Sequence, residues 1–424
     1  MIKLFPHQKQ VLKDTETYNR VAYYLDMGLG KTFVGSEKAV ELGKNILVVC
    51  QKSKVDDWYQ HFVDNYGRIA CVYNLTEFEK EDWSSFHQFN SIDDEFIDVF
   101  VINYDLIWRR KELSKLTDFT LILDESSLIQ NETSKRAKFI LKNLDPTNVI
   151  LLSGTPVNGK YEQLWSQCHL LGWKISKALF YRQYLVYSRS EDGYPIISGY
   201  KNVERLKRKL REYGAVFMKT DEVIDLPEQT FIDVKVPESK EYKKFRKDRI
   251  ITIEDKTLVG DTTLTNMLYQ RMLCGHYNEG KLEAFKDILE STNDRLVVFY
   301  NFNEECAKLE QICRENGRTI GFCNGSVKEL GVFDKNENSV ILVQYQSGAY
   351  GLNLQKANKI VYFSPPLSSD LYEQSKKRIH RIGQKNSCFY YLLKSGIDYR
   401  IYDVLAMRRD YTDNLFKEEE ECLK

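Results

Sequence analysis

The chain has 424 residues, of which 42% are hydrophobic and 29% are charged, a composition that is typical of folded globular proteins and argues against disorder. Lys and Arg together number 61, as do Asp and Glu, so the formal net charge is zero. A nucleic-acid site must therefore be a local patch. Nine Cys without a CxxC spacing indicate reduced thiols. Because we find no signal peptide and no apolar run of about 20 residues, we expect a soluble cytoplasmic protein without a membrane partner.

The first part of the chain alternates short apolar runs with charged, helix-compatible segments. The apolar runs are Val21–Leu25, Ile46–Cys50, Ile69–Tyr73, Ile97–Ile102, Leu121–Leu123 and Val149–Leu152. The clearest helical segments between them are Thr32–Leu42 and Ser134–Asn143. Strands that alternate with helices predict a parallel sheet covered on both faces.

The same alternation returns towards the C-terminus. The later runs are Leu296–Tyr300, Thr319–Phe322, Val340–Val343, Ile360–Phe363 and Phe389–Leu393, with helical segments over Lys281–Leu289 and Glu304–Glu315. The stretch Tyr161–Arg211 between the two parts reads as mostly helical, broken by the polar loop Ser188–Gly199. We therefore expect two α/β lobes, at residues 1–165 and 281–424, with a helical insertion and linker at 166–280.

A phosphate-binding loop is predicted where the first apolar run ends. The sequence Asp-Met-Gly-Leu-Gly-Lys-Thr over Asp26–Thr32 lies between a strand and a helix. Gly28 and Gly30 would let backbone N–H groups face the phosphates at the start of the helix. Lys31 would reach the β- and γ-phosphates, and the Thr32 hydroxyl would ligate Mg²⁺.

Two carboxylates end the apolar run Leu121–Leu123. Asp124 would hold Mg²⁺, and Glu125 would orient the attacking water. A solvated acidic turn is the common alternative explanation for two carboxylates after a strand. It becomes the weaker explanation when the same chain also carries a phosphate-binding loop. Ser153-Gly154-Thr155-Pro156 follows the next run and could sense the γ-phosphate, although a capped turn explains it equally well.

Basic residues in the second part are candidates for the γ-phosphate. The segment Asp370–Gly383 reads as a helix, and Gln374, Arg378 and Arg381 at i, i+4 and i+7 would share one face. The two arginines would neutralise charge that develops on the γ-phosphate. Offsetting the helix dipole is the alternative for basic residues at this end.

At these residues the chain resembles the Swi/Snf-related helicase-like ATPases, which have the superfamily-two helicase fold. The resemblance is carried by Phe5–Gln8, Asp26–Thr32, Asp124–Asn131, Ser153–Trp165, Ser347–Leu354 and Gln374–Gln384. It implies two RecA-like lobes with parallel sheets, and a DNA-stimulated ATPase that uses ATP and Mg²⁺ to translocate on double-stranded DNA. ATP bound at Lys31 and Thr32 would draw Arg378 and Arg381 towards it.

The resemblance also carries over further site residues. For ATP these are Gln8, Gly351 and Gln374, in addition to the phosphate loop. For DNA they are Lys52, Ser53, Asn103, Tyr104, Asn324, Ser326 and Asn353. Ser126-Ser127 departs from the family pattern, which puts in doubt how the nucleotide and DNA sites communicate. No histone-reading appendage fits in this length, so a minimal bacterial or phage motor is favoured over a nucleosome remodeller.

Two other functions remain open. A strand-separating DNA or RNA helicase would have the same ATP site. An interaction module that binds nucleotide as a slow switch would hydrolyse ATP with little response to DNA. The neutral net charge leaves room for a protein partner that supplies DNA targeting.

Overall fold

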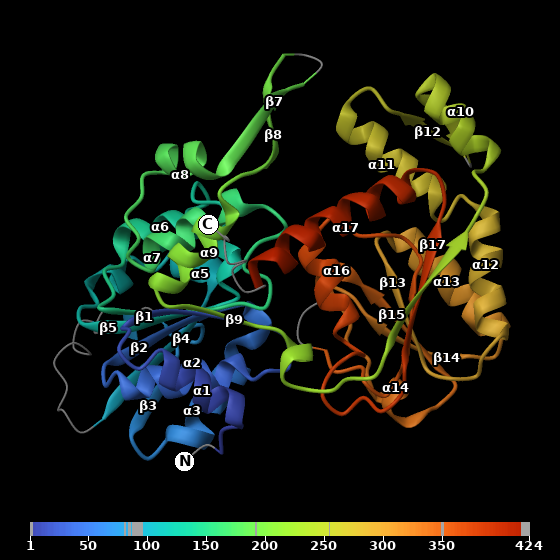
Figure 1. The fold of residues 1–424 in the computed structure, drawn as a ribbon. Helices are drawn as coiled ribbons and strands as arrows, with labels where there is room; N and C mark the ends of the chain where they lie inside the picture. Colours follow the sequence, from blue (N-terminus) through green and yellow to red (C-terminus); the bar gives the residue numbers. More distant parts are fainter. Residues whose placement is uncertain are drawn as a thin grey trace. The chain divides into compact units, whose positions relative to one another are not determined.

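The computed structural model describes residues 3–79, 82–83, 86, 96–190, 193–253, 255–348 and 352–416, which form two compact units. Unit 1 comprises Met1–Val223 together with Asp410–Lys424, and unit 2 comprises Ile224–Arg409. Each unit is built on its own parallel sheet (Figure 1), as the sequence predicts. The expected separate insertion over 166–280 is not a unit of its own. Its first part belongs to unit 1 and its remainder to unit 2.

Unit 1 contains a seven-stranded sheet in the order β3-β4-β2-β5-β6-β1-β9. Its strands are β1 (Arg20–Leu25), β2 (Asn45–Cys50), β3 (Ala70–Asn74), β4 (Ile97–Asn103), β5 (Phe119–Asp124), β6 (Asn148–Leu152) and β9 (Ala215–Met218). All neighbours in this sheet pair in parallel. Six of these strands were expected from the apolar runs, and β9 adds an edge strand beside β1.

Helices cover both faces of this sheet, because its central strands are buried on both sides. On one face lie α1 (Pro6–Asp14), α2 (Lys31–Glu41) and α3 (Val55–Tyr66), and on the other α5 (Tyr104–Ile107), α6 (Lys135–Asn143), α7 (Trp165–Leu170), α8 (Lys177–Tyr184) and α9 (Val203–Glu212) (Figure 1). Ala22 and Tyr24 of β1 point towards the second group, where they pack with Ile140 and Leu206. Short 3-10 helices occur at η1 (Lys52–Lys54), η3 (Lys111–Lys115), η4 (Ser126–Ile129), η5 (Tyr161–Leu164) and η6 (Thr220–Glu222).

A β-hairpin replaces much of the expected polar loop in unit 1. Strands β7 (Leu185–Arg189) and β8 (Pro195–Tyr200) pair antiparallel. The side chains of Val186, Tyr187 and Ile196 are 39%, 49% and 47% exposed. The hairpin therefore projects apolar side chains into solvent, which a core-facing pattern would not predict.

Unit 2 contains a six-stranded parallel sheet in the order β10-β17-β16-β13-β15-β14. Its strands are β10 (Gln229–Lys235), β13 (Leu296–Tyr300), β14 (Thr319–Cys323), β15 (Ser339–Gln344), β16 (Lys359–Tyr362) and β17 (Cys388–Lys394). The hairpin β11 (Ile250–Ile253) and β12 (Lys256–Val259) is separate from it. The helices are α10 (Lys240–Asp248), α11 (Thr263–Cys274), α12 (Glu279–Glu290), α13 (Asn303–Glu315), α14 (Gly331–Lys335), α15 (Tyr345–Gly348), α16 (Ser369–Lys376) and α17 (Ile397–Phe416).

The alternation of side chains along β13 builds two cores in unit 2. Val297 and Phe299 face a cluster that includes Tyr372 of α16 and Leu405 of α17. Leu296, Val298 and Tyr300 face the opposite cluster, which includes Phe285 of α12 and Leu309 of α13. Both faces of the strand are therefore buried.

The last residues of α17 belong to unit 1, although the helix begins in unit 2. The Tyr161 hydroxyl donates a 2.7 Å hydrogen bond to the carbonyl of Tyr411, and the Thr412 hydroxyl donates to the carbonyl of Val157. Leu415 is fully buried in the core of unit 1. The end of the chain thus completes the first core.

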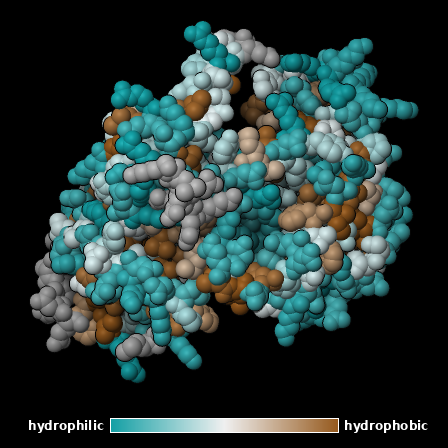
Figure 2. All heavy atoms as spheres, in the orientation of Figure 1, coloured by the Kyte–Doolittle hydropathy of each residue, from teal (hydrophilic) through white to brown (hydrophobic). Residues whose placement is uncertain are grey.

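The visible surface in Figure 2 is mainly hydrophilic, and hydrophobic side chains appear on it in small groups. Among the residues that the structure describes, none of the helices has the length and apolar character needed to cross a bilayer.

A buried ion pair links α12 to the start of α17 inside unit 2. Lys281 Nζ lies 2.6 Å from Asp398 Oδ2, and the side chains are 0% and 2% exposed. Burial raises the pKa of Asp398, and the charge of Lys281 opposes that rise. Removing the lysine would leave a buried carboxylate without its cation, which costs several kcal/mol in comparable cases.

We expect Lys281→Met to lower the free energy of unfolding by about 3–5 kcal/mol at neutral pH, as measured by chemical denaturation. The deficit should shrink as the pH falls, because the folded variant holds a proton on Asp398 more tightly than the unfolded chain does. Lys286→Met is the control, since Lys286 on the same helix is 44% exposed and pairs weakly with Glu290. Equal losses in the two variants would contradict the assignment.

Candidate functional site

The candidate nucleotide site lies at the carboxyl edge of the sheet in unit 1. In the order β5-β6-β1, Leu152 at the end of β6 pairs with Asp124 on one side and Tyr23 on the other. The three loops that follow these strands are therefore neighbours. They carry the Asp-Glu pair, the Ser-Gly-Thr-Pro segment and the glycine-rich loop. Ligands in parallel α/β sheets bind at this edge.

The glycine-rich loop requires its glycines. Gly28 and Gly30 have φ of 91° and 76°, and Gly30 is the N-cap of α2, a backbone conformation that favours glycine. A Cβ at Gly30 would lie 2.1 Å from Nε2 of Gln8. Gln8 is 3% exposed and donates from that nitrogen to the carbonyl of Leu29 over 3.0 Å. Gln8 thus supports the loop directly.

Lys31 begins α2 with its ammonium group turned back over the loop. Nζ donates to the carbonyls of Leu25 and Asp26, over 3.0 and 3.4 Å. A Cβ at Gly154 would lie 3.3 Å from the same nitrogen, so the Ser-Gly-Thr-Pro segment adjoins it. The cation is therefore held where the loop and the end of β6 meet.

The Asp-Glu pair is held from several sides. Asp124 Oδ2 accepts a 2.9 Å hydrogen bond from Nε1 of Trp58, and the carbonyl of Asp124 accepts one from the Tyr104 hydroxyl. Burial raises the pKa of Asp124, whereas the Trp58 hydrogen bond and the charge of Lys31 lower it. Asp124 is therefore held in place by hydrogen bonds from Trp58 and Tyr104.

Glu125 adopts a left-handed backbone conformation, with φ 55° and ψ 61°. Such a conformation is uncommon for a residue with a side chain and costs about 1–3 kcal/mol. Its Oε2 accepts a 3.4 Å hydrogen bond from the Ser153 hydroxyl. The strained turn thus lies where the Glu125 carboxylate meets the Ser153 hydroxyl.

Residues at this edge of the sheet carry oxygen atoms of the kind that bind a magnesium ion. Among the described residues, no three or more His, Cys, Asp or Glu side chains gather around a common point. Mg²⁺ is commonly held by one or two protein oxygens together with phosphates and water. The Thr32 hydroxyl and the Asp124 carboxylate are oxygen donors of that kind.

A buried hydrogen-bond network connects the Asp-Glu pair to the Ser-Gly-Thr-Pro segment. Gln167 is 0% exposed, and its Oε1 accepts from the hydroxyls of Tyr24 and Ser126 over 2.9 and 2.8 Å. Its Nε2 donates to the carbonyl of Pro156 over 2.8 Å. The unusual Ser126 therefore has a defined role. A lone Gln in a helical segment gave no signal by which the sequence could have identified Gln167.

We expect Gln167→Leu to lower the free energy of unfolding by at least about 2 kcal/mol, because it leaves buried polar partners without a hydrogen bond. ATP turnover should also fall, since the two loops lose their connection. Chemical denaturation and steady-state ATPase assays measure the two effects. Gln60→Leu is the control, because Gln60 is exposed and bonds to Asp64 one turn away on the same helix. Wild-type stability and turnover in Gln167→Leu would remove the network from the mechanism.

The predicted DNA contacts of unit 1 differ in exposure. Lys52 and Ser53 are exposed in η1, directly after β2. Asn103 is 7% exposed and Tyr104 is 2% exposed. The structure corrects the expectation for Tyr104: its side chain is buried under the Asp-Glu pair and supports it instead of facing solvent.

The predicted helix Asp370–Gly383 is shorter in the structure. Helix α16 ends at Lys376, and its N-cap is Ser368, whose hydroxyl accepts from the N–H of Leu371, in place of the expected Asp370. The residues after Lys376 form turns. The helical spacing of Gln374, Arg378 and Arg381 therefore does not place the three on one helix face.

Both arginines converge on one backbone carbonyl. Arg378 is 2% exposed, and its Nη1 donates to the carbonyl of Leu352 over 3.1 Å, whereas Arg381 Nη1 lies 3.5 Å from the same oxygen. Burial lowers the pKa of Arg381. Gln374 is 3% exposed and donates to Asp370 over 2.9 Å. Arg378 and Gln374 are thus buried in unit 2, and Arg381 is the more accessible arginine.

The remaining predicted residues of unit 2 lie in loops. Oδ1 of Asn324 accepts from the N–H groups of Ser326 and Val327, each over 3.0 Å, so Asn324 shapes the turn that exposes Ser326. Asn353 is exposed. Gly351 lies outside the described residues.

A glycine-rich loop, a partly buried Asp-Glu pair and a second parallel α/β unit together define a helicase-type ATPase. Comparison with known families agrees: the SNF2-related domain matches residues 14–279, and the helicase conserved C-terminal domain matches residues 280–383. The chain belongs to the SNF2-related family, which confirms the resemblance seen in the sequence.

Relatives in this family are distant in sequence. The chain is 22% identical to the putative ATP-dependent helicase/translocase YwqA of Bacillus subtilis, covering 93% of this chain and 46% of the relative. It is 24% identical to the ISWI chromatin-remodeling complex ATPase ISW1 of Saccharomyces cerevisiae, covering 87% and 36%. A solved Sulfolobus solfataricus SWI2/SNF2 ATPase core in complex with dsDNA is 20% identical, with a TM-score of 0.44, over 97% of this chain and 92% of that one. The chain thus spans less than half the length of these two curated relatives.

Proposed function

We propose that this chain hydrolyses ATP and uses the energy to translocate on double-stranded DNA. The observation that carries the proposal is the convergence of the glycine-rich loop, the Asp-Glu pair and the Ser-Gly-Thr-Pro segment on one sheet edge. Membership of the SNF2-related family supports the choice of duplex DNA as the track. The names of the relatives, which include a helicase/translocase, favour the same activity.

In this proposal the loop from Gly28 to Thr32 binds the phosphates through backbone N–H groups and the dipole of α2. The ammonium group of Lys31 exchanges its carbonyl partners for phosphate oxygens. Thr32 and Asp124 would hold Mg²⁺, which would neutralise phosphate charge and orient the chain of phosphates. Glu125 positions the attacking water through its carboxylate.

Arg378 and Arg381 supply positive charge to the γ-phosphate during hydrolysis. Both arginines contact the carbonyl of Leu352, so a shift of either arginine would move the loop before β16. That loop includes the candidate DNA contact Asn353. We propose that this contact couples hydrolysis to movement on DNA. Lys52, Ser53, Ser326 and Asn353 remain the proposed backbone contacts, because they are the exposed members of the predicted set.

The test compares ATPase rates without nucleic acid and with duplex DNA, single-stranded DNA and RNA, at two salt concentrations. We expect duplex DNA to stimulate most, with an effect that falls steeply as salt rises. Displacement of a triplex strand without unwinding of a fork would support translocation. Fork unwinding would instead identify a strand-separating helicase, and an ATPase that ignores nucleic acid would identify a nucleotide switch.

A further inference from the structure

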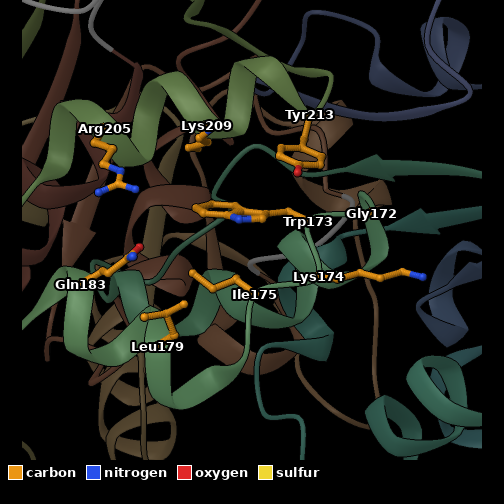
Figure 3. A pocket seen from close by; sticks show the side chains of 9 residues that line it. All are labelled: Gly172, Trp173, Lys174, Ile175, Leu179, Gln183, Arg205, Lys209 and Tyr213. Atoms are coloured by element: carbon orange, nitrogen blue, oxygen red, sulfur yellow. The ribbon is translucent and has the colours of Figure 1, made fainter.

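A pocket in unit 1 lies between α8 and α9 and has a volume of about 420 Å³ (Figure 3). Arg205, Lys209 and Tyr213 line one wall at intervals of four residues, so they share the same side of α9 and its C-terminal cap. Gln183 of α8 faces them across the opening, and Trp173 lies deeper between the two walls. Pockets of this size accommodate a group as large as a nucleotide.

The pocket contains a fixed aromatic surface. The ring of Trp173 lies nearly parallel to that of Tyr213, with centroids 5.9 Å apart and planes 13° apart. The rings of Phe180 and Tyr184 meet Trp173 edge-on, each with centroids 6.1 Å away. Trp173 is nevertheless only partly buried. Rings that are held in this way offer a preformed surface for stacking.

The rim of the pocket is positively charged. Lys174 and Arg205 are exposed, and neither side chain has an ion-pair or hydrogen-bond partner within the described part of the chain. The helix Val203–Glu212 carries five Lys or Arg against two Glu. Glu204 is paired with buried Lys207, and Glu212 is paired with both Lys209 and Arg208. A chain with zero net charge therefore presents a local cationic patch here.

The pocket is separate from the nucleotide site. Gly172 lies beside Arg20, which begins β1 and donates to the carbonyl of Leu170 over 2.7 Å. The glycine-rich loop follows Leu25 at the other end of the same strand. A strand of this length spans roughly 17 Å, so the two sites lie at opposite edges of the sheet.

We propose that this pocket binds one nucleotide of a single-stranded nucleic acid. The base stacks on the aromatic pair, as in other single-strand binding surfaces, and its phosphate meets Arg205. The amide of Gln183 can both donate to and accept from a base edge. An acidic peptide would match the charge but would leave the parallel rings and the amide without a specific role. The choice of nucleic acid rests on the proposed function, in which the chain already works on DNA.

The experiment measures the anisotropy of a fluorescein-labelled twelve-residue oligothymidylate that is titrated with the full chain. We expect Arg205→Ala to weaken binding at least about ten-fold, because it removes a charge-assisted phosphate contact. Arg208→Ala should change binding less than about two-fold. It removes the same charge from the same helix, but its side chain is 58% exposed and does not line the pocket. Trp173→Leu should also weaken binding, and quenching of Trp fluorescence by the oligonucleotide should fall with it.

Three outcomes would overturn the proposal. Equal losses in Arg205→Ala and Arg208→Ala would indicate diffuse electrostatic binding. Displacement of the oligonucleotide by low concentrations of ATP or thymidine monophosphate would assign the pocket to a free nucleotide. If binding of a glutamate-rich peptide that contains Phe depended on Arg205, and binding of the oligonucleotide did not, the pocket would be assigned to a partner protein.

The assay also separates this proposal from the proposed function. Duplex-stimulated ATPase should be unchanged in Arg205→Ala, since Arg205 lies outside the nucleotide machinery. Binding of the oligonucleotide that depends on Arg205, in a chain whose ATPase ignores duplex DNA, would reject the motor and retain this site.

Discussion

Replacing Lys31 by Ala is expected to reduce ATP turnover by about 100-fold or more, because the ammonium group stabilises charge on the phosphates. The carbonyls of Leu25 and Asp26, which now accept from Lys31, would lose that partner. They lie at the edge of the sheet where water can replace it, so we expect the fold to survive. Steady-state ATPase assays with and without duplex DNA measure the loss, and thermal melting tests the fold.

Lys44→Ala is the matched control for this variant. Lys44 is 41% exposed, pairs with Asp118, and lies just before β2 at the edge opposite the glycine-rich loop. It should keep wild-type turnover. Retained ATPase in Lys31→Ala would exclude the glycine-rich loop as the phosphate site, even if the fold is intact.

Arg381→Ala is expected to lower the turnover number by about two to three orders of magnitude, in the range seen when an arginine finger is removed. Binding of a fluorescent ATP analogue should persist, because the phosphate loop is untouched. The melting temperature should change little, since Arg381 is only partly buried and its 3.5 Å contact with Leu352 is weak. Arg400→Ala, at an exposed position early in α17, is the control.

Arg378→Ala should differ from Arg381→Ala in one respect. Arg378 is buried and bonds more closely to Leu352, so its loss should lower the stability of unit 2 by about 1–3 kcal/mol in addition to lowering turnover. A variant Arg378→Ala that loses stability while keeping full turnover would make Arg378 a structural residue. Unchanged turnover in Arg381→Ala would remove that arginine from the mechanism.

Most strands of the two sheets could be predicted from the sequence, because the central ones are buried on both faces and therefore appear as continuous apolar runs. Strand β10 was missed, since none of its residues is buried. Strand β9 was less visible, since it is short and Phe217 and Met218 are only partly buried. The hairpin β7–β8 was missed because its apolar residues face solvent and give no core pattern. The helix over 370–383 was predicted too long, because the periodicity of Gln374, Arg378 and Arg381 continues past the point where the backbone turns.

The residues of the candidate site also divide into those that the sequence identifies and those that it does not. Lys31, Asp124 and Glu125 were identified by type and position, since Lys31 ends the glycine-rich loop after β1 and the two carboxylates stand where β5 ends. The residues that hold them in place could not be identified from the sequence. Trp58 is 66 residues from Asp124, to which it bonds, and Gln167 is 41 residues from Ser126. Contacts at such separations leave no local pattern. Tyr104 was assigned to DNA for the same reason, as its burial depends on the whole sheet.

The position of the last turns of α17 has a consequence for how the protein is made. A ribosome releases residues 1–223 long before it adds Tyr411, Thr412 and Leu415, which complete the core of the same unit. The core of the first unit therefore stays incomplete, with part of its apolar interior exposed to water, until the second unit has been synthesised. A fragment that stops at residue 223 should be prone to aggregation, and a chain cut just after Arg409 should share that weakness although all of its strands are present.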